Sequence, residues 1–230
     1  MKKTVANQQN SRRISLILTG ACIFLLLCIS AAAQTTSIEL TKIDADGNTL
    51  DQQSYDYSWL EENLPIYGDD ITMRYLQGPV FIEDEEKRWD PEELTNIKEH
   101  GIFMGTNIAD IIDLIGMNEN DSVRIIAEDG YYKEFPYDVI YNPDPRQGPM
   151  ILCWWERNEG YVPSFSDGMT LAFFAETVNS QGISVFGAHD MKELWDEAYW
   201  YFFSSGTEQY PTTTGLSVKW ISELQVIEQT

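Results

Sequence analysis

Polar and apolar residues alternate with a period of two in several segments of the chain, which is typical of strands with one buried face. Residues 37–43 and 50–57 are two such β-prone runs, and an Asp- and Gly-rich stretch lies between them. Residues 123–127 and 131–135 form a second pair around an Asp-Gly turn. Turns of this composition join antiparallel neighbours, so the sequence predicts two hairpins.

Two other segments, residues 150–155 and 169–174, are almost continuously apolar and have the length of strands. This pattern is typical of central strands that are covered on both faces. Residues 216–227 alternate again and are rich in β-branched side chains, which predicts a final strand.

A helical period appears in residues 106–116, where four isoleucines recur at i, i+3, i+4 and i+7 before a glycine. Three capping boxes predict further helices. The first, residues 58–61, starts a helix that Pro65 stops, and the second, residues 90–93, opens a helix that ends near Gly101. The third, residues 190–193, starts a helix with one shared apolar face: Met191, Leu194, Trp195, Ala198 and Phe202.

Strands and short helices are interspersed without a regular βαβ rhythm, which predicts an α+β fold with a mixed sheet. No internal repeat, linker or low-complexity tract divides residues 34–230, so we expect them to form a single domain. With 43% hydrophobic and 13% aromatic residues, the chain has enough apolar material for a sizeable core.

Residues 1–33 have the composition of an export signal. Four basic residues precede the apolar run 14–33, which ends on three alanines before Gln34. We expect cleavage there and a secreted or extracytoplasmic protein. The alternative is an uncleaved anchor, because 20 apolar residues are long enough to span a bilayer, and residues 14–33 would then be the only membrane contact.

The charge excludes some partners. The whole chain has a net charge of -22, and residues 1–33 carry 4 of the 15 basic residues and none of the 37 acidic ones, so residues 34–230 carry 11 minus 37, or -26. A surface this acidic does not favour binding to nucleic acid or to anionic lipid.

Four common motifs are absent from the sequence: the phosphate loop, the dinucleotide-binding glycine motif, the zinc-protease motif and the serine-hydrolase elbow. His100 and His189 are the only histidines, and we expect both to be surface or capping residues. Cys153 is the only cysteine after residue 33, which excludes a disulfide within residues 34–230. We expect its thiol to be buried as a small hydrophobic group.

Four segments, in this order, resemble the molybdopterin-binding oxidoreductase domain of the sulfite oxidase type: GTNIADIIDLIGM, VRIIAEDGYYKEFPYDVI, PMILCWW and GLSVKWISELQVIE. Five others, YSWLEENLPIYGDD, QGPVF, RWDPEE, RQGPMILCWW and GYVPSFSDGM, resemble a branch of secreted archaeal proteins that carry this domain. The resemblance implies the mixed α+β fold of that family.

In the catalytic family a cysteine thiolate binds molybdenum upstream of the helix that residues 107–115 resemble. This sequence has no cysteine between Gln34 and Leu152. The hypothesis is therefore a non-catalytic ligand-binding or surface module without a cofactor, whose partner is a small molecule or a surface protein. The alternative is a molybdenum or tungsten pterin oxidoreductase that binds molybdopterin with a substituted ligand, such as Glu83.

Two groups of residues are candidates for ligand contacts. Arg146 and His189 are the basic residues expected to face an anionic ligand, although an exposed loop arginine without a ligand is the alternative for Arg146. The aromatic residues Trp154, Trp155 and Tyr161 are expected to line a cleft that holds a cofactor, a small molecule or a sugar. The alternative for these aromatics is packing in the core and at its rim.

Overall fold

The computed structural model describes residues 35–229, and the chain divides into residues 1–33 and a compact unit of residues 34–230. The predicted export signal or anchor lies outside the described residues. Within 35–229 no helix is long and apolar enough to cross a membrane. The described part contains mixed sheets and short helices, so the predicted α+β class is confirmed.

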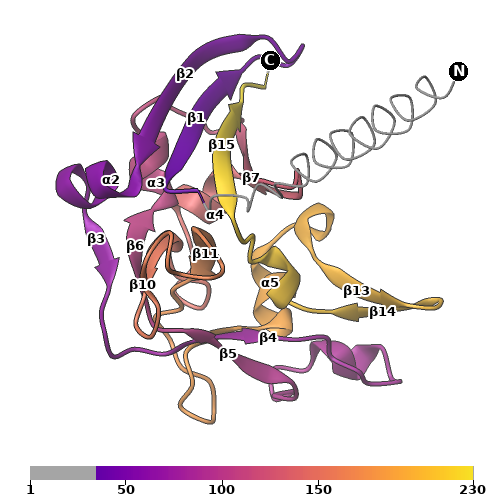
Figure 1. The fold of residues 1–230 in the computed structure, drawn as a ribbon. Helices are drawn as coiled ribbons and strands as arrows, with labels where there is room; N and C mark the ends of the chain where they lie inside the picture. Colours follow the sequence, from indigo (N-terminus) through magenta and orange to yellow (C-terminus); the bar gives the residue numbers. More distant parts are fainter. Residues whose placement is uncertain (1–34, 230) are drawn as a thin grey trace, which may run out of the picture. The chain divides into compact units, whose positions relative to one another are not determined.

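The first sheet contains both predicted hairpins and the final strand (Figure 1). Its strand order is β2-β1-β15-β7-β8, and β1 pairs parallel with β15 whereas the other neighbours are antiparallel. The sheet is therefore mixed, as predicted. The bounds are β1 Ser37–Ile43, β2 Thr49–Asp56, β7 Ser122–Ala127, β8 Tyr132–Pro136 and β15 Ile221–Ile227.

The second sheet is built around β9 (Met150–Glu156), which pairs with three other strands. All of its residues except Trp155 are buried, which confirms the prediction of a central strand. The order is β10-β9-β6-β3, with β11 also paired to β9. The other bounds are β3 Ile66–Gly68, β6 Phe103–Asn107, β10 Gly160–Tyr161 and β11 Thr170–Phe173.

A third sheet and a separate hairpin complete the strands. The sheet has the order β12-β4-β5, and the hairpin consists of β13 and β14 (Figure 1). Two backbone hydrogen bonds join them: Val80 N donates to Pro211 O, and Thr213 N donates to Gln77 O. The bounds are β4 Arg74–Gln77, β5 Ile97–Gly101, β12 Val185–Phe186, β13 Phe202–Ser205 and β14 Glu208–Pro211.

The helices are short: α2 Tyr57–Asn63, α3 Ile108–Ile112, α4 Tyr137–Tyr141 and α5 Ala188–Leu194, with 3-10 turns η1 Glu86–Trp89, η2 Glu197–Tyr199 and η3 Thr214–Leu216. Helix α3 confirms the isoleucine pattern, although it ends before Ile115. Its three isoleucines are fully buried against β6 and β9. The predicted final strand begins only at Ile221, because the chain forms η3 first.

The first capping box was assigned to the wrong residue. The helix does begin there, but the cap of α2 is Asp56, whose Oδ1 accepts a hydrogen bond from Trp59 N at 2.8 Å. Ser58 instead donates its hydroxyl to the Asp56 carboxylate at 2.7 Å. The helix ends before Pro65, as predicted. A carboxylate two residues earlier can take the place of the serine because aspartate and serine are both good caps.

The second capping box does not start a helix. Asp90 accepts a hydrogen bond from Glu92 N at 2.9 Å, which closes a turn, and residues 97–101 then form β5. This strand pairs antiparallel with β4. The prediction was wrong because pairing with a strand about 20 residues away outweighs local helix signals.

The third capping box was shifted and its helix was too long. Gly187 is the N-cap of α5, and Asp190 is the third helical residue, whose carboxylate accepts from Gly187 N at 3.3 Å. The helix ends at Leu194, because Trp195 has an extended backbone. Phe202 therefore lies in β13 and does not share a helix face with Met191.

Candidate functional site

Arg146 lies in the loop before β9 and is surrounded by carboxylates. Its Nε is 3.1 Å from Asp144 Oδ1, and its Nη1 is 2.8 Å from Glu193 Oε2 and 3.5 Å from Asp190 Oδ1. Hydrogen bonds raise the pKa of Arg146 above its ordinary value, and the bond to Glu193 contributes more than the bond to Asp144. The guanidinium charge is already matched within the protein, so it is a poor receptor for an anionic ligand.

His189, the second predicted basic residue, lies close to Arg146. Its Nδ1 is 2.8 Å from the carbonyl oxygen of Trp89, so this nitrogen carries the proton and donates it. Its Nε2 is 3.6 Å from Glu193 Oε2. Both ring nitrogens face protein groups, and the imidazole joins α5 to η1. This role is structural and differs from the predicted surface or capping role.

The structure brings Arg146 and His189 to one hollow of about 200 Å³. Glu92, Glu93 and Asp190 also line this hollow. Carboxylates outnumber basic groups there, which makes the hollow unsuitable for an anion. Burial raises the pKa of Asp190 above its ordinary value.

The predicted aromatic cluster is mostly packing. Trp154 is 0% exposed, and its indole nitrogen donates to Thr106 Oγ1 at 3.1 Å. Tyr161 is stacked on Trp154 with a ring-centroid distance of 5.7 Å, and its hydroxyl donates to Glu61 at 2.8 Å. Trp155 is partly exposed on β9. Tyr161 lies on the neighbouring strand β10, and Trp154 has no surface to offer a ligand.

Cys153 lies in the middle of β9 and is 0% exposed. Burial raises the pKa of its thiol well above the ordinary value, so the thiolate is not formed near neutral pH. The side chain belongs to the main hydrophobic core, which confirms the expectation of a buried free cysteine.

Residues 71–81 lie upstream of the helix that residues 107–115 resemble, in the region where the catalytic family has its metal-binding cysteine, and they contain no cysteine. They include Arg74, whose guanidinium lies 3.9 Å over the ring of Phe174 and whose buried Nε has no hydrogen-bond partner. A guanidinium has no lone pair to donate and repels a metal cation. Gln77 is also unsuitable, because its amide is bonded to backbone groups of Glu93, Thr95 and Ala188.

Glu83, the predicted substitute ligand, is exposed on the loop before η1. Among residues 35–229, no group of three or more His, Cys, Asp or Glu side chains is placed to hold a metal ion.

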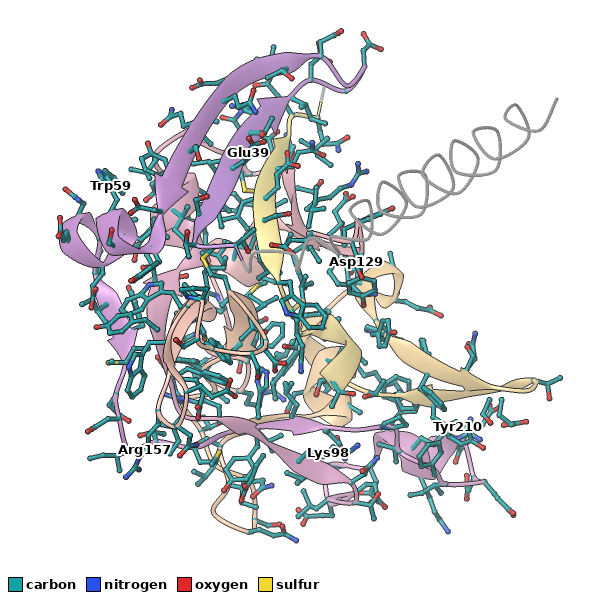
Figure 2. All side chains as sticks on the ribbon, in the orientation of Figure 1. Glu39, Trp59, Lys98, Asp129, Arg157 and Tyr210 are labelled. Atoms are coloured by element: carbon teal, nitrogen blue, oxygen red, sulfur yellow. The ribbon has the colours of Figure 1, made fainter. Side chains whose placement is uncertain are left out.

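A basic hollow of about 270 Å³ lies beside β5, and the sequence patterns did not identify it. Lys98, His100 and Lys219 line it together with Glu99 and Ser217 (Figure 2 labels Lys98). Ser217 donates its hydroxyl to Leu171 O at 2.7 Å, so His100 Nε2, 3.1 Å away, is the donor to Ser217. Burial, with a smaller contribution from Lys219, lowers the pKa of His100 to about 4. His100 is partly buried in a structural contact, and the predicted surface or capping role was wrong.

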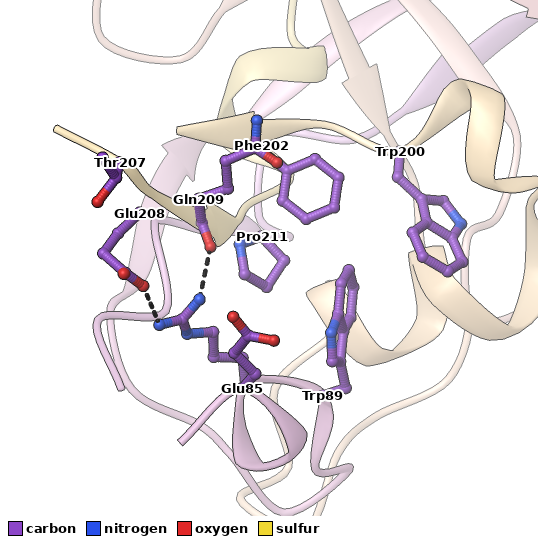
Figure 3. Close-up of a pocket in the computed structure, with 9 residues that line it drawn as sticks. Glu85, Trp89, Trp200, Phe202, Thr207, Glu208, Gln209 and Pro211 are labelled. Atoms are coloured by element: carbon purple, nitrogen blue, oxygen red, sulfur yellow. Dashed lines mark hydrogen bonds and ion pairs between the residues drawn. The ribbon is translucent and has the colours of Figure 1, made fainter. Parts of the chain in front are cut away.

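A groove of about 320 Å³ with three aromatic side chains in its lining lies between η1 and the β13–β14 hairpin (Figure 3). We call it the aromatic groove. Trp89 meets Trp200 at a centroid distance of 5.1 Å and Phe202 at 5.8 Å. The complete lining is Glu85, Arg88, Trp89, Trp200, Phe202, Thr207, Glu208, Gln209 and Pro211.

Arg88 fixes the shape of the aromatic groove. It is 5% exposed, and its guanidinium donates to Ile82 O at 2.6 Å, to Gln209 O at 2.8 Å and to Glu208 Oε2 at 2.9 Å. It also lies 4.6 Å over the ring of Tyr210. One buried side chain therefore ties the acidic loop 82–85 to the hairpin.

The sequence patterns do not reveal the aromatic groove. They predict a helix face for Phe202 and single out neither Trp89 nor Trp200. The useful signal was the adjacent pair Arg88 and Trp89, since arginine and aromatic residues are enriched at binding surfaces. The partners on the hairpin are more than 100 residues away and only the fold unites them.

No family model matches the chain, and a search of curated proteins finds no match. The resemblance to the molybdopterin-binding domain therefore remains a prediction.

Proposed function

We propose that the chain is an extracytoplasmic, non-catalytic module that binds a small molecule, built on a scaffold related to the molybdopterin-binding oxidoreductase domain. The observation that carries the proposal is the position of Cys153. Its thiol is enclosed in the core at 0% exposure, and residues 71–81 contain no cysteine and hold the partly buried guanidinium of Arg74. A scaffold related to the molybdopterin-binding domain that has lost the metal-binding thiolate keeps its surface hollows, and it lacks a ligand of the metal that would transfer electrons.

Binding is supported by open hollows with unused polar groups. In the aromatic groove, the side chains of Glu85, Gln209 and Thr207 have no hydrogen-bond partner within residues 35–229. Sites for small molecules typically combine apolar walls with a few such polar groups. The acidic surface agrees with an exported protein that stays hydrated.

The test is elemental analysis of the exported protein. The full chain is produced in a host that makes molybdopterin and is collected outside the cytoplasm. Molybdenum and tungsten are measured by mass spectrometry, and pterin is measured by fluorescence after oxidation. We expect far less than one metal atom per chain. One molybdenum or tungsten atom per chain, together with pterin, would overturn the proposal.

The same preparation tests localisation. Sequencing of the N-terminus is expected to begin at Gln34, and the protein is expected in the soluble exported fraction. Retention in the membrane fraction with residues 1–33 still attached would support the anchor and contradict cleavage.

The alternative is a molybdenum or tungsten pterin oxidoreductase with a substituted ligand. One observation favours it: Lys98 and Lys219 lie at the same hollow in a chain with few basic residues, and such a pair suits a phosphate or an oxyanion. An observation against this alternative is that Lys219 already forms an ion pair, because its Nζ lies 2.5 Å from Asp167 Oδ2. The metal analysis separates the two functions.

A further inference from the structure

We propose that the aromatic groove is a binding site for a neutral saccharide. This inference rests on the proposed binding function, and it names the site and the class of ligand. It is carried by the hydrogen-bonding groups, the aromatic walls and the local charge balance.

Several polar groups that line the groove have no hydrogen-bond partner within residues 35–229. The Glu85 carboxylate has no partner within residues 35–229, and Glu208 uses only Oε2, in its contact with Arg88. The Gln209 side-chain amide and the Trp89 indole N–H also have no partner in that part of the chain. In Figure 3 the indole nitrogen of Trp89 lies on the side of the groove where the Glu85 carboxylate is drawn. These groups offer both acceptors and donors, which match the paired hydroxyls of a sugar ring.

The walls suit the apolar face of a sugar ring. Trp200 is held in place by its indole N–H, which donates to Trp195 O at 2.9 Å, so its ring is fixed before a ligand arrives. Phe202 is nearly perpendicular to Trp89, with an interplanar angle of 87°. Rigid aromatic rings provide contact area at a low entropic cost. The C–H groups of a pyranose can lie on these rings while its hydroxyls reach the polar rim.

The charge balance favours a neutral ligand over an organic cation. Two carboxylates, Glu85 and Glu208, line the groove together with the guanidinium of Arg88. A second cation is close, because Lys192 Nζ lies 5.1 Å from the centroid of the Trp89 ring. The four charges cancel, and the cation-binding capacity of Trp89 is already engaged by a protein group.

The volume sets the size of the ligand. About 320 Å³ is at the lower end of the roughly 300–1,000 Å³ that small-molecule sites occupy. The groove therefore accommodates one or two sugar rings, for example the end of a longer chain.

The test uses the full chain and a panel of neutral hexasaccharides of glucose, mannose, galactose and N-acetylglucosamine. Binding is measured by calorimetry and by tryptophan fluorescence. We expect at least one saccharide to bind, to change the fluorescence and to bind equally well at low and high salt, because the ligand is uncharged.

Two variants test whether the saccharide binds in the aromatic groove. Glu85→Gln and Gln209→Ala remove groups without a protein partner, so both variants should fold, and circular dichroism checks this. We expect Glu85→Gln to weaken binding about tenfold, because a charge-assisted hydrogen bond is lost. Glu86→Gln is the matched control, an exposed glutamate one residue further on, and should bind like the wild type.

The outcomes are separable. Unchanged saccharide affinity in both groove variants, or no binding by any saccharide, would overturn the inference. Binding of tetramethylammonium that weakens with salt and with Glu85→Gln would replace the saccharide with a cation and leave the proposed module function standing. A chain loaded with metal and pterin would instead overturn the proposed function itself.

Discussion

The guanidinium of Arg146 lies 2.8 Å from the carboxylate of Glu193, 47 residues further along the chain. Asp144 and Asp190 complete a set of three carboxylates around it. This arrangement balances the guanidinium charge within the protein. It joins the loop before β9 to helix α5.

We expect Arg146→Ala to lower the melting temperature by only about 2 °C, because partly exposed ion pairs contribute little to stability. The difference from the wild type should shrink in high salt. Thermal unfolding followed by circular dichroism measures both effects. Arg157→Ala is the control, since Arg157 is exposed after β9 and has no ion pair in residues 35–229 (Figure 2). A loss of ten degrees or more would contradict this account.

Arg88→Met should be far more costly than a surface change. The substitution keeps much of the side-chain volume but leaves the carbonyl groups of Ile82 and Gln209 without their donor. We expect a loss of about 3 kcal/mol in the free energy of unfolding. Urea denaturation measures it, and Lys87→Met, an exposed neighbour, should change stability by less than about 0.5 kcal/mol. Equal effects of the two substitutions would show that Arg88 does not hold the hairpin.

The Cys153 thiol should be inert in the native protein. In the full chain with Cys22 and Cys28 replaced by serine, a colorimetric thiol reagent at pH 8 is expected to modify no cysteine within hours. Burial and the raised pKa of the thiol are the reasons. In denaturant, one thiol per chain should react at once. Rapid labelling without denaturant would place this thiol at the surface and remove the main support for the proposed function.

His100 should make the protein less stable in mild acid. Burial lowers the pKa of His100 to about 4, below its ordinary value of 6.5. The unfolded chain therefore takes up a proton below pH 6.5 that the folded chain does not. Stability should fall between about pH 6.5 and pH 4, with a slope of up to about 1.4 kcal/mol per pH unit from this residue.

The variant His100→Gln separates this effect from that of the carboxylates, which titrate at lower pH. Glutamine keeps a donor for Ser217 and does not titrate. Urea denaturation at pH 4 to 7 should show a shallower loss of stability for the variant than for the wild type. Parallel curves for the two proteins would mean that His100 is not the group responsible.

Where adjacent residues decide the structure, the sequence was sufficient. Both hairpins were predictable because Asp, Gly and alternating side chains set the turn and the faces together, and Gly47 and Gly130 adopt the positive φ that such turns require. The buried strand β9 and the isoleucine face of α3 followed from hydrophobic periodicity. The burial of Cys153 followed from its position within an apolar run.

Only the tertiary structure decided the rest. Residues 97–101 became a strand through pairing with β4, and Phe202 left the predicted helix to join the hairpin. The carboxylates that surround Arg146 come partly from helix α5, more than 40 residues further along the chain. Trp89 and Trp200 lie 111 positions apart in the sequence, yet their rings meet at 5.1 Å. Hydrogen bonding and burial between distant segments are cooperative and leave little trace in local patterns, whereas turn chemistry and periodicity act over a few residues.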